Sequence, residues 1–306
     1  MNDLSHLTEQ TKSQIILDDE SRILSLNDDR WIGYPKALRI INMLTDLINQ
    51  SRQIRPECLL IVGDSNIGKT TVIRQFCQKF YSIPIYDVNM GITDVQRLVL
   101  CIQAPVKANV KELYINILEH FFVPFRPTDP ESKLRHQALH LMRKFSTKML
   151  IIDEIHNILS GTARQQLEVM NTLKYLSNEL QLNIVGVGTK EAALVLHTDA
   201  QLASRFGVID LPKWNLDEDF LRLLLSYKKL LPLKYDSDLA SKEIATLLFD
   251  ISGGNFGNLN KLLIECAKEA IRIGTERITI EIIQKYKWLK PTEGVRGVRK
   301  MKLSNI

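Results

Sequence analysis

The sequence has no long apolar run and no apolar stretch near its amino terminus. None of its apolar segments approaches the roughly 20 residues that a membrane-spanning helix needs, so we expect no membrane partner. Residues 1–14 are polar and lack the apolar core of a signal peptide. A cytoplasmic location is therefore the expectation.

The sequence also lacks clustered cysteines. Its four cysteines show neither a CxxC pair nor the Cys/His spacing of a metal site, so we expect no structural disulfide and no zinc site. Two of them, Cys58 and Cys101, lie in or beside apolar runs and are interpreted as buried thiols. The four are Cys58, Cys77, Cys101 and Cys266.

The net charge of +5 is unevenly distributed along the 306 residues. Residues 1–30 hold seven acidic and three basic side chains, whereas residues 290–306 hold five basic side chains and one acidic one. A basic segment is compatible with a nucleic-acid partner. It is weak support alone, because exposed lysines are common on ordinary surfaces.

Between residues 37 and 212, short apolar segments alternate with segments whose apolar residues recur at helical spacing. Such alternation predicts an α/β fold with a parallel sheet covered by helices on both faces. Beyond Pro212 the strands largely stop while helical spacing continues. The predicted strands are 58–62, 98–102, 149–152, 184–187 and 208–211, and a loop is expected from about 81 to 95.

These patterns predict four parts of the chain. Residues 1–30 lack sustained periodicity and are expected to form an amino-terminal extension, followed by a core over 31–212. A smaller α-helical domain is expected over 213–288, with Asn215 and Glu218 as the capping box of its first helix. Residues 289–306 form the basic tail.

The segment Gly63–Thr70 matches the phosphate-loop pattern GxxxxGK[ST] between an apolar strand and a helix. Its glycines allow a tight turn whose N–H groups point at phosphate oxygens, and the helix amino terminus adds positive potential. Lys69 is expected to contact the β- and γ-phosphates of ATP, and Thr70 to bind Mg²⁺. The expected nucleotide-binding residues are Gly63, Asp64, Ser65, Asn66, Ile67, Gly68, Lys69, Thr70 and Thr71.

Two acidic residues follow the apolar strand 149–152. Because the strand is buried, Asp153 should emerge at the sheet edge that carries the phosphate loop, where it can bind Mg²⁺. Glu154 is then placed to polarise the attacking water as general base, which favours hydrolysis over transfer to another acceptor. The alternative is that both acids are merely solvated at a strand end. His156 is interpreted as a loop or packing residue.

Two further residues are candidates for contacting the γ-phosphate. Thr189 ends the strand 184–187 and is expected to hydrogen-bond the phosphate or the attacking water, or else to cap the next helix. Arg205 precedes the last strand, where an arginine of one subunit can reach the nucleotide of a neighbour and stabilise transition-state charge. A surface ion pair is the competing interpretation for Arg205.

With these motifs in order, residues 29–286 resemble the TniB/TnsC ATPases of the AAA+ class, which regulate DNA transposition, and TniB looks closest. The segments Asp29–Tyr34, Leu59–Gly63, Leu150–Asn157, Val185–Thr189 and Ala203–Phe206 carry the resemblance. It implies a P-loop AAA+ domain with a helical lid, in which Ile32 and Tyr34 lie near the adenine. Packing of the first helix onto the core is an equal alternative for these two side chains.

The chain departs from the AAA+ pattern at one position. The lid helix of AAA+ proteins often begins with an arginine that senses nucleotide, and here Asn258 occupies that place. Asn258 can donate a hydrogen bond but carries no charge, and Lys261 lies one turn along as a possible substitute.

The resemblance also implies partners. Proteins of this kind bind double-stranded DNA when loaded with ATP, assemble into rings or helical filaments, and recruit or activate a DDE transposase, in related systems with a TniQ-type adaptor. We expect Lys107, Lys111 and Arg126 to contact DNA, because sequence-independent binding needs cations that meet phosphates. The alternative is that these three are ordinary solvated side chains.

Two other functions fit the same motifs. A replication initiator or helicase loader would usually carry a dedicated DNA-reading domain, for which we expect no room after Tyr286. A nucleotide-gated protein scaffold would hydrolyse ATP poorly, and Glu154 argues against that interpretation.

Overall fold

The computed structural model describes residues 4–28, 30–51, 53–80, 83–87, 91–196 and 204–286; for 83–87 and 91–94 it describes the backbone alone. The chain divides into two compact units. One, here called the sheet unit, comprises residues 35–65 and 69–212. The other, the helical unit, comprises residues 1–34, 66–68 and 213–306.

The sheet unit is built on five parallel strands in the order β4-β5-β6-β1-β7. The predicted parallel sheet is therefore confirmed. Each strand is about five residues long, and β1, β5 and β6 are almost entirely buried, as their continuous apolar sequences require. The strands are β1 (Cys58–Val62), β4 (Val99–Gln103), β5 (Met149–Asp153), β6 (Asn183–Gly188) and β7 (Phe206–Asp210).

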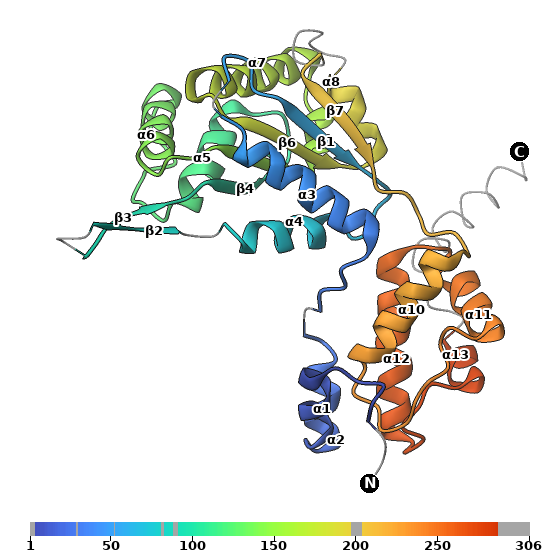
Figure 1. Cartoon of the computed structure of the whole chain (residues 1–306). Helices are drawn as coiled ribbons and strands as arrows, with labels where there is room; N and C mark the ends of the chain where they lie inside the picture. The colour runs from blue at the N-terminus through green and yellow to red at the C-terminus, as the bar shows by residue number, and fades with distance from the viewer. Residues whose placement is uncertain are drawn as a thin grey trace, which may run out of the picture. The chain divides into compact units, whose positions relative to one another are not determined.

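Helices cover both faces of this sheet (Figure 1). Alternate strand residues such as Leu100, Leu150 and Ile184 pack with α5 (Val110–His120), α6 (Glu131–Lys144) and α7 (Ala163–Leu180). The intervening residues face the layer of α3 (Pro35–Asn49) and α4 (Lys69–Gln78). Among the described residues between β5 and β7 there are also three short helical segments: η1 (Ile155–Ser160), η2 (Lys190–Ala192) and α8 (Ala193–Leu196).

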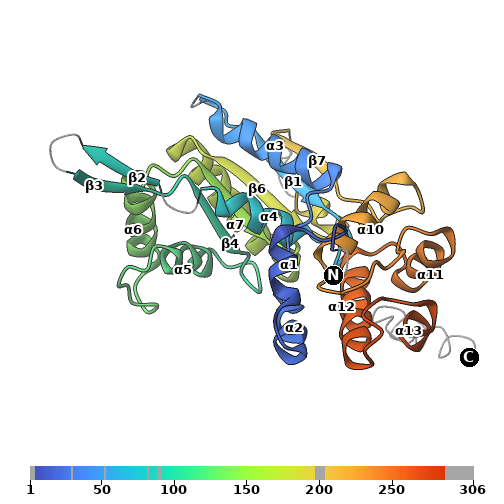
Figure 2. The same cartoon turned by 60° about the horizontal axis from the view of Figure 1, so that its bottom comes forward.

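The loop expected from about 81 to 95 is instead a hairpin, so that prediction is wrong. Strand β2 (Ile83–Asp87) pairs antiparallel with β3 (Gly91–Gln96), and the ribbon projects away from the main sheet in both views (Figure 1 and Figure 2). Pro84 lies within β2 and cannot donate a ladder hydrogen bond, which makes the strand hard to recognise from sequence. A two-stranded ribbon tolerates it because each strand has a free edge.

The helical unit contains α10 (Glu218–Leu230), α11 (Lys242–Ser252), α12 (Phe256–Arg272) and α13 (Ile280–Lys285). Asp217, not Asn215, caps α10, because its carboxylate accepts from the amide of Phe220, three residues on. The capping box expected from Asn215 and Glu218 is therefore wrong. The basic tail lies outside the described residues.

Residues 4–28 form two short helices within the helical unit. Thr8 and Asp18 cap α1 (Glu9–Ile15) and α2 (Asp19–Ser25) with their side chains. The side chain of Arg22 is fully buried and donates to both oxygens of Glu276, at 2.8 and 2.6 Å. A buried ion pair thus joins the two ends of the sequence inside one unit.

Candidate nucleotide-binding site

The phosphate loop and the acidic pair meet at the carboxyl edge of the sheet. Strand β1 lies between β6 and β7, and the amide of Gly63, which follows β1, donates to the carbonyl of Gly188 at 3.2 Å. Strand β5 lies beside β6 and ends at Asp153. Parallel pairing therefore brings the residues that follow three strands to one edge.

The loop itself has the conformation that its sequence demands. Gly68 has a φ of +97°, which strains any residue with a side chain, and Asn66 has a φ of +63°. The ammonium group of Lys69, at 6% exposure, donates to the carbonyls of Gly63 and Asp64 at 3.0 and 2.8 Å. Burial lowers the pKa of Lys69, while the carboxylates of Glu154, Asp153 and Asp64 oppose that shift. The cation is thus held at the loop's own backbone.

Thr70 and Asp153 supply two oxygen atoms where a magnesium ion is expected. The Thr70 hydroxyl donates to Oδ2 of Asp153 at 2.8 Å, and the amide of Glu154 donates to Oδ1 at 2.9 Å. Asp153 is only 6% exposed. Hydroxyl and carboxylate oxygens are the ligands that Mg²⁺ prefers, so this pair fits the ion. Among the described residues, no cluster of three His, Cys, Asp or Glu side chains fits a different metal site.

Glu154 adopts a left-handed backbone conformation, with a φ of +54°. A left-handed conformation is uncommon outside glycine, and such residues concentrate at functional sites. Its carboxylate is 44% exposed, so water has access to it. The side chain therefore has the access to water that a general base would require.

His156 lies closer to this site than the sequence indicated. Its Nδ1 is 3.2 Å from Oε2 of Glu154, although the two atoms are not aligned as a hydrogen bond. The ring also packs against Gly188, where an added Cβ would come within 3.2 Å of Nδ1. The signal in the sequence was its spacing of two residues from Glu154, which the η1 turn converts into contact.

Thr189 follows β6 directly beside Gly63, at the edge where the other candidates lie. Its hydroxyl makes a hydrogen bond to the carboxylate of Glu191, which is the main cause of the lowered pKa of Glu191. Thr189 occupies the cap position of η2 but makes no side-chain cap bond.

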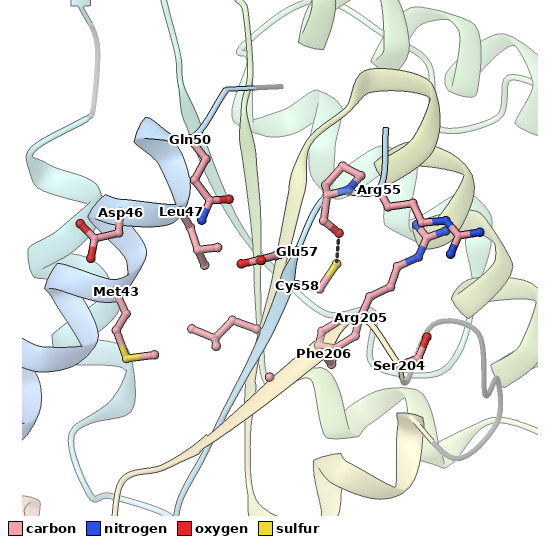
Figure 3. A pocket seen from close by; sticks show the side chains of 13 residues that line it. Met43, Asp46, Leu47, Gln50, Arg55, Glu57, Cys58, Ser204, Arg205 and Phe206 are labelled. Carbon is pink, nitrogen blue, oxygen red and sulfur yellow. Dashed lines mark hydrogen bonds between the residues drawn. The ribbon is translucent and has the colours of Figure 1, made fainter. Parts of the chain in front are cut away.

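Arg205 lies where the strands begin, at the end of the sheet opposite to the one that carries the phosphate loop. Its carbonyl accepts from the amide of Cys58, the first residue of β1, and the five-residue strand is about 16 Å long. The guanidinium donates to Oδ1 of Asn178 at 2.7 Å. Arg205 also lines a cavity of about 940 Å³ between the amino ends of β1 and β7 and the carboxyl half of α3 (Figure 3). It cannot reach the phosphate loop of its own chain.

In the helical unit, Ile32 and Tyr34 are buried, at 5% and 6% exposure. The Tyr34 ring packs edge-on against Trp214 and against Phe256, with centroids 5.0 and 5.7 Å apart. Both side chains therefore belong to the packed interior of the helical unit.

Asn258 lies in the first turn of α12 and is 7% exposed. Its side-chain carbonyl accepts from Nδ2 of Asn66 at 3.1 Å, and its amide group donates to the carbonyl of Ser252 at 3.3 Å. Lys261, the proposed substitute, is exposed. The predicted sensor position is therefore occupied by an uncharged side chain with both ends bonded.

The three candidate DNA-binding cations do not form one patch. Lys107 lies in the loop after β4, and Lys111 in the first turn of α5. Arg126 follows α5, a helix about 16 Å long. It lines a separate cavity of about 730 Å³ with α6 residues, including Lys133, His136 and His140.

Solved structures similar to this chain are AAA+ proteins. Cdc6p of Pyrobaculum aerophilum matches with a TM-score of 0.59 and 17% identity, over 88% of this chain and 70% of that one. ORC2 of Aeropyrum pernix, solved with ADPNP and ADP, gives 0.57 and 15%, over 85% and 70%. Drosophila ORC bound to DNA gives 0.54 and 13%, over 91% and 66%. These likenesses confirm the predicted AAA+ fold with its helical carboxyl-terminal region.

Sequence comparison identifies the family. None of the curated proteins compared with this chain matches it. The sequence model described as Bacterial TniB protein matches residues 22–216, which is more than half of the chain and includes the phosphate loop, the acidic pair and Arg205. No helix of the described residues is both long and apolar enough to cross a membrane. The chain belongs to the TniB family of AAA+ proteins.

Proposed function

We propose that this protein is an ATP-hydrolysing, DNA-binding regulator of DNA transposition. The observation that carries the proposal is the hydrogen bond between Thr70 and Asp153 beside the buried ammonium group of Lys69. That arrangement supports binding of a triphosphate with Mg²⁺ held by Thr70 and Asp153. The family match supports transposition, whereas the likeness to Cdc6 and ORC concerns the fold alone.

Hydrolysis is the reaction that the acidic pair supports. Thr70 and Asp153 would hold the magnesium ion, which when bound would neutralise phosphate charge. Lys69 and the loop amides orient the phosphates, and Glu154 takes a proton from water as it attacks. Asp153 accepts from the amide of Glu154, which holds the backbone beside this base in a fixed position. Thr189 is proposed to orient the water or the γ-phosphate from the adjoining strand end.

Arg205 is proposed to act on the nucleotide of a neighbouring copy. It lies about one strand length from its own phosphate loop, too far to contact a γ-phosphate there. A guanidinium supplied by another subunit stabilises the charge of the transferring phosphoryl group, so turnover depends on assembly. We propose rings or filaments of this chain, without a commitment to subunit number.

Double-stranded DNA is the proposed platform for that assembly, with Lys107, Lys111 and Arg126 as candidate phosphate contacts. Ile32 and Tyr34 are proposed to lie near the adenine of ATP, and Asn258 is proposed to take the place of the nucleotide-sensing arginine. A DDE transposase, with or without a TniQ-type adaptor, is the partner that we propose this protein recruits or activates.

The deciding experiment measures phosphate release by the full chain with and without duplex DNA, beside a Lys69→Ala variant. We expect DNA to stimulate turnover of the unaltered chain. The variant should bind ATP about 100-fold more weakly or worse, because it loses charge-assisted hydrogen bonds of about 1.5–3 kcal/mol each. Unchanged ATP affinity in the variant would refute the placement of the nucleotide. A rate of phosphate release that is the same with and without DNA would favour the scaffold function.

A further inference from the structure

The structure brings together two cysteine thiols that are distant in the sequence. Cys77 lies in the last turn of α4, and Cys101 lies in the middle of β4. The two thiols lie close enough to perturb each other's pKa, and neither takes part in a disulfide. None of the functions proposed above uses this pair.

The backbone accounts for the pairing independently. Leu100 and Ile102 face the core shared with α5, α6 and α7, so Cys101, between them, points to the opposite face, which α4 covers. On α4, the buried residue Ile73 lies one turn before Cys77 on the same side of the helix. Helix α4 contacts β4 directly. Strand register and helix periodicity thus aim the two side chains at each other.

Cys77 and Cys101 are only half-buried, and β4, which carries Cys101, is an edge strand of the sheet. Cys58 and Cys266 are 3% and 0% exposed and serve as internal references. The interpretation of Cys101 as a fully buried thiol is therefore wrong, since the sequence does not show that its strand lies at an edge.

We propose that Cys77 and Cys101 form a reversible redox modification site, in which a peroxide converts the two thiols into a disulfide. One sulfur, as thiolate, attacks a peroxide oxygen, and the O–O bond breaks to release water, leaving a sulfenic acid. The second sulfur attacks the first and displaces the hydroxyl group as water. Two thiols and one hydrogen peroxide thus give one disulfide and two waters.

The thiolate is the nucleophile in such steps, so whichever of the two thiols ionises attacks the peroxide, and the other resolves the sulfenic acid.

The position of the disulfide suggests that it controls ATP turnover. This part of the inference rests on the proposed ATPase function. Helix α4 begins at the phosphate loop, where Thr70 is bonded to Asp153. A disulfide at Cys77 would fasten the other end of the same helix to β4. The helix that carries Lys69 and Thr70 would then be held to the sheet at both ends.

Peptide mapping of the full chain after hydrogen peroxide treatment tests the site. Trypsin should release residues 75–79 and 98–107 as one linked species, separable by dithiothreitol, with an intact mass lower by two hydrogens. Cys77→Ser and Cys101→Ser should each abolish the linked species, whereas Cys58→Ser should retain it. Alkylation of both free thiols after peroxide treatment, or linkage only between chains, would overturn the proposal.

ATP turnover tests the consequence. We expect peroxide to lower turnover of the unaltered chain, dithiothreitol to restore it, and the Cys77→Ser variant to be insensitive. A bridge that forms without altering turnover would overturn the control of α4. Absence of turnover in reduced Cys77→Ser and in the reduced unaltered chain alike would instead count against the ATPase function.

Discussion

At the scale of single residues, the site depends on charged groups that the fold removes from water. Lys69 and Asp153 are each 6% exposed, yet each is hydrogen-bonded, Lys69 to backbone carbonyls and Asp153 to a hydroxyl and an amide. Buried charge is tolerated only when its hydrogen bonds are made. The protein's own hydrogen bonds therefore hold both charged groups in place.

Replacing Glu154 with glutamine tests the proposed base. We expect ATP affinity to be retained and turnover to fall by about 10²- to 10⁴-fold, because an amide cannot accept the proton of water. Equilibrium ATP binding and phosphate release measure the two quantities separately. Glu168→Gln, at an exposed ion pair on α7, is the matched control and should keep normal turnover. Normal turnover in Glu154→Gln would remove Glu154 from the mechanism.

Replacing Glu276 with glutamine tests the buried ion pair. Arg22 is fully buried, and Glu276 is 7% exposed on its side chain, so the variant leaves a buried guanidinium short of its partner. We expect the free energy of unfolding of the helical unit to fall by about 3 kcal/mol, against less than about 0.5 kcal/mol for Glu218→Gln at an exposed ion pair of α10. Urea titration followed by circular dichroism measures both. Equal effects would show that the pair adds nothing to stability.

The same pair makes stability depend on pH. Burial would raise the pKa of Glu276, but hydrogen bonds from Arg22 and Lys234 outweigh it and lower the pKa below the ordinary 4.5. A carboxyl whose pKa is lower in the folded state stabilises above its unfolded pKa, and this contribution is lost as the pH falls through the folded value. The difference between the unaltered chain and Glu276→Gln should therefore be full at pH 7 and shrink below about pH 4.

At the scale of elements, strand order decides which residues work together. The phosphate loop, Asp153 and Thr189 follow β1, β5 and β6, which are adjacent, so parallel pairing collects them. Arg205 precedes β7 and therefore lies at the amino ends of the strands, where its guanidinium donates to Asn178 of α7. Being next to a strand in the sequence is thus insufficient to place a residue at the site. A residue that follows a strand lies at its carboxyl end, with the phosphate loop, whereas a residue that precedes a strand lies at its amino end.

The Arg205→Ala variant tests action between subunits. We expect it to lower turnover only when the protein is assembled on DNA, by about 10³-fold, since an arginine supplied from a neighbour contributes on that order. Dilute protein without DNA should hydrolyse ATP at the same low rate in both forms. Phosphate release measured against protein concentration gives both values. A loss in the dilute protein would instead assign Arg205 a role within its own subunit.

Much of the element pattern could be read from the sequence, and the failures have physical causes. Apolar strands β1, β5 and β6 were recognisable because both of their faces are buried. The hairpin β2–β3 was missed because Pro84 interrupts the strand signal. The helices α1 and α2 were missed because they are only seven residues each and depend on partners more than 200 residues away, as with Arg22 and Glu276.

At the scale of the whole molecule, the salt dependence of DNA affinity should report how many phosphates the protein contacts. The slope of the logarithm of the binding constant against the logarithm of salt concentration is about −0.9 per phosphate contact. We expect Lys107→Ala and Arg126→Ala each to weaken binding and to reduce the slope by about 0.9. Lys242→Ala, an exposed lysine of the helical unit, should leave the slope unchanged. An unchanged slope in either test variant would make that residue an ordinary solvated cation.

The sequence alone determined the phosphate loop, the strand that ends in Asp153 and the class of the fold. Each of these depends on neighbouring residues or on a short periodic pattern of apolar residues. Only the tertiary structure decided which distant groups meet. It placed His156 beside Glu154, Arg205 beyond reach of its own phosphate loop, and Cys77 against Cys101. Such contacts depend on strand order and on which face a helix covers, and neither is encoded in any local stretch of the chain.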